Sequence, residues 1–207
     1  MKPNPIPPLH VVTDDAVVAR PDFLRQAGQV IAAGGPLVLF HLRAPRASGR
    51  RLYELGRALM HPVYYEDGFI VVNDRADVAM AIEADGVQLG ARGLRASDAR
   101  QLDLDWVGVS VHAVDEARAG QADGADFVLA GTIWQTPSHP DRRGAGTGLI
   151  RGIAALGIPA IAIGGVTPER MAEARDAGAA GVATIRGVWD APDPAAAVSE
   201  YLKHWKG

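Results

Sequence analysis

Eight short runs rich in valine, isoleucine and leucine alternate along the chain with longer, alanine-rich stretches that carry charged residues. Continuous apolar runs of this kind are typical of parallel strands that are covered by helices on their faces. Eight strand–helix units in 207 residues satisfy a minimal (β/α)8 barrel, or TIM barrel. A doubly wound open sheet is the alternative, because periodicity does not show whether the sheet closes. We therefore predict an α/β fold with a single barrel domain over residues 1–207.

The predicted strands are short and are bounded by glycine, proline or charged residues. They span residues 9–14, 37–43, 69–74, 86–90, 106–112, 126–132, 158–165 and 181–187. Helical patterns lie between them at residues 22–33, 76–83, 114–122 and 167–177. In the helix predicted at residues 167–177, Thr167 is suited to the N-cap position and Pro168 to the first helical position. Gly178 is expected to end this helix.

Charge and composition limit the class of partner. The formal net charge is −3, and lysine and arginine are scattered, so we expect no nucleic acid partner. We expect no membrane partner either, because no apolar run approaches the roughly 18 to 20 residues of a membrane span and the first residues lack a signal-peptide segment. The absence of cysteine excludes disulfides and fits a cytoplasmic protein. A small molecule is the expected partner, and a homo-oligomer is left open.

Two predicted strand ends favour a phosphate site. Active sites of such barrels lie at the C-terminal ends of the strands, and loops seven and eight often bind phosphate. Gly164 and Gly165 end the seventh strand, where bare backbone N–H groups could approach an anion. Ile185, Arg186 and Gly187 end the eighth strand, and Arg186 could add a charge-assisted contact. Alternatively, the glycines serve tight packing alone and Arg186 is a solvated rim residue.

Polar side chains also end the second and third predicted strands. Asn73 and Asp74 could orient a hydroxyl, a ring nitrogen or a metal-bound water, or they could cap the helix that begins at Ala76. His41 and Arg43 occupy alternate positions of the second strand and therefore share a face. We interpret both pairs as candidates for contact with a ligand.

The fifth strand and the loop after the sixth strand supply further candidates. Ser110 and His112 share a face of the fifth strand, and His112 could act as a general base or could be a structural histidine. The segment 132–148 is polar and rich in proline and glycine, which is typical of a functional loop, although a plain surface excursion is the alternative. Its ligand-contacting candidates are Thr136, Ser138 and His139.

A family resemblance rests on seven motifs in order. They are LHVVTD, HLRAP, VVNDRADVA, ADGVQLG, VGVSVH, GADFVLAGTIWQTPS and IPAIAIGGV, and together they resemble the thiamine phosphate synthase and TenI superfamily along nearly the whole chain. The resemblance implies a TIM barrel in thiamine biosynthesis that binds a phosphorylated thiazole with loops seven and eight. In the synthases, the thiazole attacks a pyrimidine methyl diphosphate while Mg²⁺ holds the departing diphosphate.

The matching positions imply site roles for individual residues. Contacts with the pyrimidine diphosphate, its metal or the thiazole are implied for Arg43, Asn73, Asp74, Ser110 and Thr136. If Mg²⁺ is used, the resemblance makes Asp74 a metal ligand. Gly164 and Gly165 match the phosphate loop.

Three departures from the synthase pattern bear on the reaction. Pro45 stands where synthases carry a lysine, and residues 91–93 replace a segment that holds a second metal-binding aspartate. Residues 136–139 lack the lysine that meets the diphosphate. Because positioned cations stabilise a departing diphosphate, we expect these losses to weaken synthase chemistry.

TenI-type relatives lack the diphosphate apparatus, and the activity implied for them is proton transfer that aromatises a thiazole tautomer without a cofactor. We therefore favour TenI-like proton transfer, with an active synthase and a non-catalytic phosphate binder as alternatives. Thr132 stands at the position where the tautomerase has its histidine. Thr132 is therefore expected to contact the substrate and not to act as the base. The base would then be His139, His112 or His41.

Overall fold

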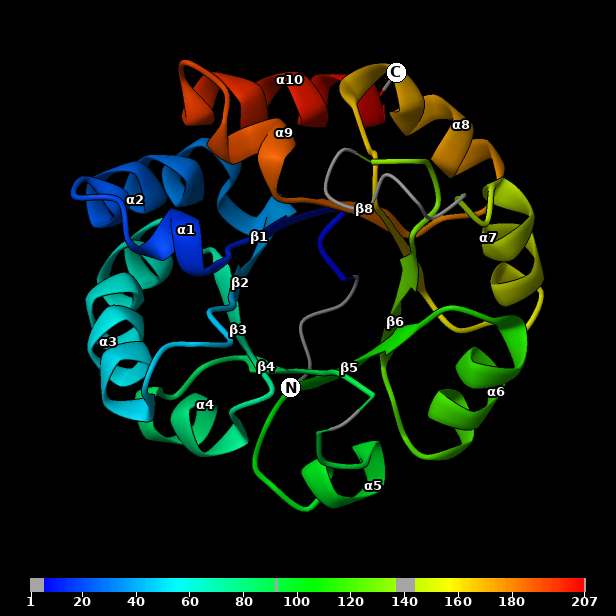
Figure 1. Ribbon diagram of the computed structural model, residues 1–207, viewed down its shortest axis with the longest axis horizontal. Coiled ribbons are helices and arrows are strands. Elements are labelled where there is room, and N and C mark those ends of the chain that lie inside the picture. The colour runs from blue at the N-terminus through cyan, green and yellow to red at the C-terminus, as the bar shows by residue number, and fades with distance from the viewer. Residues whose placement is uncertain (1–5, 92, 137–143, 207) are drawn as a thin grey trace.

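Eight parallel strands form a closed barrel in the computed structural model, which describes residues 6–91, 93–136 and 144–206. Neighbouring strands pair in chain order, and β1 pairs with both β2 and β8. The strands are β1 Leu9–Val12, β2 Val38–Leu42, β3 Phe69–Asn73, β4 Gly86–Leu89, β5 Trp106–Val111, β6 Phe127–Gly131, β7 Ala160–Ile163 and β8 Gly181–Thr184. Figure 1 shows the ring of strands inside an outer ring of helices. The closed barrel confirms the predicted fold and excludes the open sheet.

The helices are α1 Asp15–Val18, α2 Phe23–Gly34, α3 Gly49–Tyr65, α4 Ala76–Ile82, α5 Ala96–Ala99, α6 Val114–Ala122, α7 Thr147–Ala154, α8 Met171–Asp176, α9 Arg186–Trp189 and α10 Pro194–Lys206. The predicted helix 167–177 is divided into a 3₁₀ turn, Pro168–Arg170, and α8. Thr167 takes the N-cap position, but its side chain makes no capping hydrogen bond. Within the described residues, no helix is long and apolar enough to cross a membrane.

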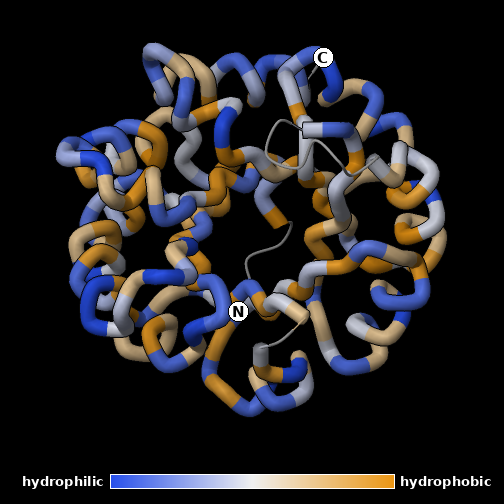
Figure 2. Tube along the Cα trace, in the orientation of Figure 1, coloured by the Kyte–Doolittle hydropathy of each residue, from blue (hydrophilic) through white to orange (hydrophobic). Residues whose placement is uncertain are grey.

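Alternation along each strand divides the apolar core into two parts. The larger part lies between the strands and the helices. The smaller part fills the barrel lumen with residues from β1 to β3 and β5 to β8, namely Val12, Leu39, Val71, Trp106, Phe127, Leu129, Ile161 and Ala183. Figure 2 shows apolar colouring along the strands and on much of the inner side of the helices. The lumen is therefore a packed core, and a ligand site has to lie at an end of the barrel.

Candidate active site

The loop after β7 brings bare backbone close to a neighbouring loop. β7 ends at Ile163, so Gly164 and Gly165 lie in the loop and not in the strand as predicted, with positive φ angles of 95° and 65°. A Cβ at Gly164 would lie 2.5 Å from Thr132 Cγ2, and one at Gly165 would lie 2.7 Å from the Gln135 carbonyl oxygen. Both positions require glycine because of the backbone conformation and because of this close approach.

Two side chains hold the loop after β7. Arg170 donates to the Gly165 carbonyl, and its guanidinium lies 5.4 Å from the centre of the Trp134 ring. Tyr201 of α10 donates its hydroxyl hydrogen to the Val166 carbonyl at 3.0 Å. These contacts fix the loop on two sides, which keeps its backbone N–H groups in one arrangement.

The chain turns into a helix directly after β8. The strand ends at Thr184, Ile185 is the N-cap of α9, and Arg186 and Gly187 form its first turn. The prediction that residues 185–187 end a strand is therefore wrong, because the backbone bends into a helix one residue after Thr184. A Cβ at Gly187 would lie 2.1 Å from the Tyr201 hydroxyl oxygen, so any side chain there would have to displace Tyr201.

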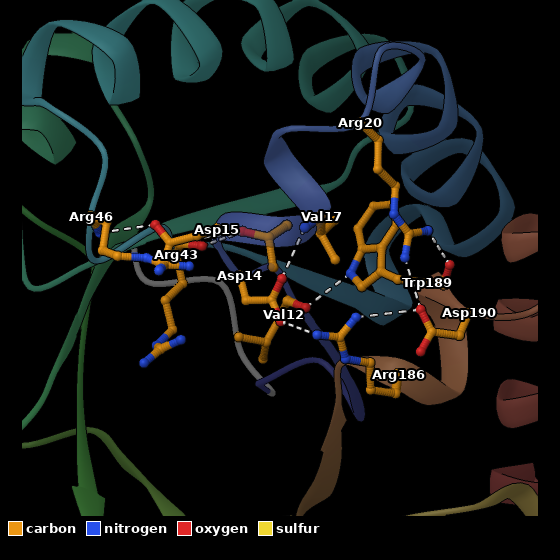
Figure 3. Close-up of polar contacts among 11 residues, drawn as sticks. Val12, Asp14, Asp15, Val17, Arg20, Arg43, Arg46, Arg186, Trp189 and Asp190 are labelled. Carbon is orange, nitrogen blue, oxygen red and sulfur yellow. Dashed lines mark hydrogen bonds and ion pairs between the residues drawn. The ribbon is translucent and has the colours of Figure 1, made fainter. Parts of the chain in front are cut away.

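Arg186 is already bound to carboxylates. Its Nη2 lies 2.7 Å from Asp14 Oδ2 and its Nη1 lies 3.4 Å from Asp190 Oδ1 (Figure 3). Arg20 also pairs with Asp190 at 2.8 Å, and the Trp189 indole donates to the Val12 carbonyl at 2.9 Å. The Arg186 guanidinium thus joins the segments after β1 and β8. We infer that backbone N–H groups, more than this side chain, would meet an anion here.

A cavity of about 150 Å³ opens at the rim beside β2 and β3. It is lined by Arg43, Ala44, Pro45, Ala47, Leu52, Asn73, Asp74 and Arg75. Asp74 has a positive φ of 60°, and its Oδ1 accepts a hydrogen bond from Gly90 N at 2.7 Å. Arg75 takes the N-cap position of α4, so the alternative that Asn73 or Asp74 caps this helix is wrong.

Arg43 is positioned through its backbone. The Thr13 hydroxyl accepts from Arg43 N and donates to the Arg43 carbonyl, both at 2.8 Å. In Figure 3 the Arg43 guanidinium points away from the neighbouring Asp15–Arg46 ion pair. This leaves a cation beside the cavity that Asp74 also lines.

His41 lies inside the barrel and not at its mouth. Its ring is fully buried, and its Nε2 lies 2.9 Å from Nδ1 of His10, which is also fully buried. Burial lowers the pKa of His41 to about 3, although the nearby Asn73 amide acts in the opposite direction. Burial also lowers the pKa of His10, and the Coulomb repulsion of His41 adds to this effect. A ring with a pKa of about 3 is a poor general base near neutral pH, so the structure does not favour the catalytic assignment of His41, which stays a prediction.

Further candidates among the described residues lie on the arc formed by β5 and β6. Ser110 accepts a hydrogen bond from Gln88 Nε2 at 3.1 Å, and His112 is exposed with its Nδ1 against the Gly131 carbonyl. Thr132 packs beside Gly164. Thr136 is half-buried, whereas Ser138 and His139 lie outside the described residues.

Sequence reasoning missed His10 and Gln88, which are almost fully buried polar residues of β1 and β4. The available signal was their position, because each is a single polar residue inside an otherwise apolar strand.

A closed barrel with bare glycine backbone after β7 and β8, and a polar cavity beside β2 and β3, has the site geometry of TIM-barrel enzymes that act on phosphorylated small molecules. The family model described as thiamine monophosphate synthase matches residues 9–188, and the chain belongs to this family.

Individual relatives agree with this family. A thiamine-phosphate synthase of Moorella thermoacetica is 41% identical over 171 residues, which cover 80% of this chain and 81% of the relative. A thiamine-phosphate synthase of Pyrococcus furiosus is 32% identical over 197 residues, which cover 94% of this chain and 93% of the relative. The solved structure of thiamine phosphate pyrophosphorylase from Pyrococcus furiosus superposes with a TM-score of 0.83 at 30% identity, covering 96% of this chain and 95% of that one. These relatives favour the synthase alternative over the TenI-like interpretation that the sequence analysis preferred.

Proposed function

We propose that the protein is a thiamine phosphate synthase, which joins a thiazole phosphate to hydroxymethylpyrimidine diphosphate and releases diphosphate. The observation that carries this proposal is the presence of two polar sites on opposite arcs of one barrel mouth. The glycine loop follows β7 and the Arg43–Asp74 cavity borders β3, four strands away in a ring of eight. A coupling reaction needs two such sites, whereas a tautomerase needs only the thiazole site.

In this proposal the thiazole phosphate lies at the loops after β7 and β8. Backbone N–H groups at Gly164, Gly165 and Gly187 are not covered by side chains of their own residues and favour negative charge. The first N–H groups of a helix also have no partner within that helix. Arg170 and Tyr201 support the site by holding the loop carbonyls from outside.

The pyrimidine diphosphate would lie at the cavity beside β2 and β3, where Arg43 supplies positive charge. Asp74 suits a Mg²⁺ ion that arrives with the diphosphate, because it is exposed and one of its oxygens is held by Gly90 N–H. No cluster of three acidic, histidine or cysteine residues occurs among the described residues, so the ion would have to be held by Asp74 together with phosphate oxygens. Bound there, Mg²⁺ would neutralise charge on the departing diphosphate.

The reaction makes a bond between the thiazole nitrogen and the pyrimidine methylene carbon, and it breaks the bond from this carbon to the diphosphate oxygen. No proton has to be removed from the thiazole, so the chemistry needs no general base. This agrees with Thr132 in place of a histidine and with the burial of His41. The protein contributes by holding the two substrates in line and by stabilising the negative charge that develops on the departing diphosphate.

Arg43→Ala tests the diphosphate site. Loss of a charge-assisted contact costs about 1.5–3 kcal/mol, so the KM for the pyrimidine diphosphate should rise about tenfold to 100-fold while the KM for thiazole phosphate stays unchanged. Arg46→Ala is the matched control, because its side chain is 84% exposed and pairs with Asp15. Steady-state kinetics with each substrate varied would measure both constants. Equal effects of the two substitutions would contradict the assignment.

A further inference from the structure

Exposed large apolar side chains gather on one side of the outer wall of the barrel. Six such side chains occur among the described residues, and five of them lie on the neighbouring helices α2, α3 and α4. These five are Leu24 of α2, Tyr53, Tyr64 and Tyr65 of α3, and Met80 of α4. Because α3 packs between α2 and α4, we call the outer surface of these three helices the α3 face (Figure 1). Exposed apolar side chains concentrated in this way mark a surface that binds another molecule.

The outward side of α3 carries a ridge of aromatic and arginine side chains. The members of the ridge are exposed and are spaced by three or four positions, which places them along one side of the helix, and they are Arg50, Tyr53, Arg57, His61 and Tyr64. Tyr64 is 79% exposed and Tyr65 is 70% exposed, although their ring centres lie only 5.7 Å apart. Tyrosine and arginine are the residue types that contribute most to binding at protein interfaces, so the ridge favours a protein partner.

The charges of α3 are divided between its two ends. The first half of the helix carries three exposed arginines and one exposed glutamate, and two exposed acidic residues follow its last turn. In chain order these residues are Arg50, Arg51, Glu54, Arg57, Glu66 and Asp67. The helix dipole adds positive charge at the first end and negative charge at the second end. Two copies of α3 that run antiparallel therefore bring opposite charges together at both ends, whereas two parallel copies would place like charges together.

We propose that the α3 face binds a second copy of this chain in a two-fold symmetric dimer in which the two α3 helices lie antiparallel. A symmetric contact requires a surface that is complementary to itself, and the division of charge along α3 supplies this complementarity. The dimer is independent of the proposed reaction, because the α3 face lies on the outer wall of the barrel (Figure 1).

Antiparallel pairing about the middle of α3 also brings arginine to tyrosine. It sets Arg50 of one copy level with Tyr65 of the other, and it sets Arg51 level with Tyr64. A guanidinium over a tyrosine ring is attracted by the charge distribution of the ring. Arg57 lies near the two-fold axis, about one helical turn from the level of Glu54 of the other copy, which offsets the two like charges at this point.

The size of the contact sets the expected affinity. A helix of 17 residues is about 25 Å long, so a contact centred on two such helices buries less than the roughly 800 Å² per partner of a standard interface. We expect a weak dimer with a dissociation constant on the order of 10 to 100 µM. Because charged residues contribute at both ends, the dimer should weaken as the salt concentration rises.

Analytical ultracentrifugation over roughly 5 to 500 µM should show monomer at the lowest concentrations and dimer at the highest. Tyr64→Ala should weaken the dimer about tenfold, because it removes an exposed aromatic side chain from the ridge. Leu94→Ala is the matched control, because Leu94 is 47% exposed and lies outside the α3 face. A wild-type protein that stays monomeric throughout would leave the α3 face to a different partner and would overturn the proposal. Equal dissociation constants for the two variants would also overturn it.

Two charge-reversed variants test the antiparallel arrangement. They are Arg50→Glu/Arg51→Glu and Glu66→Lys/Asp67→Asn. Both should fold, because the helix dipole favours acidic side chains in the first turn and basic ones near the last. A glutamate at position 51 is also suited to a capping box with Ser48, the N-cap of α3, and asparagine is suited to the positive φ of 50° at Asp67. Circular dichroism of each variant would check the fold.

The two variants should behave differently alone and together. Alone, each places like charges together at both ends of the antiparallel pair, so each should dimerise at least about tenfold more weakly than the wild type. When the two variants are mixed in equal amounts, every reversed end meets an opposite charge, and the mixture should associate with nearly the wild-type constant. A mixture that associates no better than the separate variants would overturn the antiparallel contact, and so would separate variants that dimerise like the wild type.

Discussion

Gly165→Ala is expected to lower kcat/KM for thiazole phosphate by about 100-fold, because small displacements of a substrate-positioning loop have effects of this size. The backbone of Gly165 has a φ of 65°, which costs a residue with a side chain about 1–2 kcal/mol. The new Cβ would also lie 2.7 Å from the Gln135 carbonyl oxygen and 2.9 Å from Trp134 Cβ, so the loop after β7 has to move away from the loop after β6. Kinetics with thiazole phosphate varied would measure the loss.

Gly157→Ala separates this effect from simple backbone strain. Gly157 has a similar positive φ of 80°, but nothing lies within 4 Å of the Cβ position, and it precedes β7 at the other end of the barrel. This control should lose about 1 kcal/mol of stability and keep its kcat/KM. A Gly165→Ala protein with wild-type kinetics would show that the loop after β7 does not bind the thiazole phosphate.

The free energy of unfolding should fall steeply as the pH drops from 7 to 5. The folded-state pKa of His41 is about 3, against an ordinary value of 6.5, and the pKa of His10 is lowered as well. Between these values the unfolded chain binds protons that the folded protein excludes, so stability is greatest above pH 6.5 and is lost as the pH falls below it. His41 should contribute a loss of about 2 kcal/mol over this range, and His10 acts in the same direction. Urea unfolding at several pH values would measure the slope.

The double variant His10→Gln/His41→Gln is the control for this prediction, because it replaces both imidazoles with groups that do not titrate. Contributions from carboxylates elsewhere are common to both proteins and cancel in the comparison. The loss of stability between pH 7 and 5 should become much smaller in the variant. Equal losses in the two proteins would show that the histidines are not held neutral.

The strand pattern predicted eight parallel strands because buried parallel strands leave continuous apolar runs, and all eight occur near their predicted positions. The pattern did not decide whether the sheet closes, which depends on the pairing of β1 with β8. Strand ends were less predictable. Ile185 looks apolar enough to continue β8, yet the chain turns there into α9, where Gly187 lies against the Tyr201 hydroxyl. That contact comes from α10, the next helix along the chain, and no pattern within residues 181–187 indicates it.

The places of Asn73, Asp74 and the glycines after β7 at the mouth of the barrel were predictable from the strand ends, and their roles in binding stay predictions. It was not predictable where the partner is distant in sequence. Arg186 binds Asp14, which lies 172 residues away, and the burial of His41 depends on His10 of the adjacent strand. A lone histidine in an apolar strand looks the same whether it points into a barrel or toward its mouth.

The most direct test of the synthase assignment is a parallel assay of one purified preparation for coupling and for thiazole tautomerisation. With thiazole phosphate, the pyrimidine diphosphate and Mg²⁺, we predict one thiamine phosphate formed for each diphosphate released. Conversion of the thiazole tautomer without any thiamine phosphate would contradict the account.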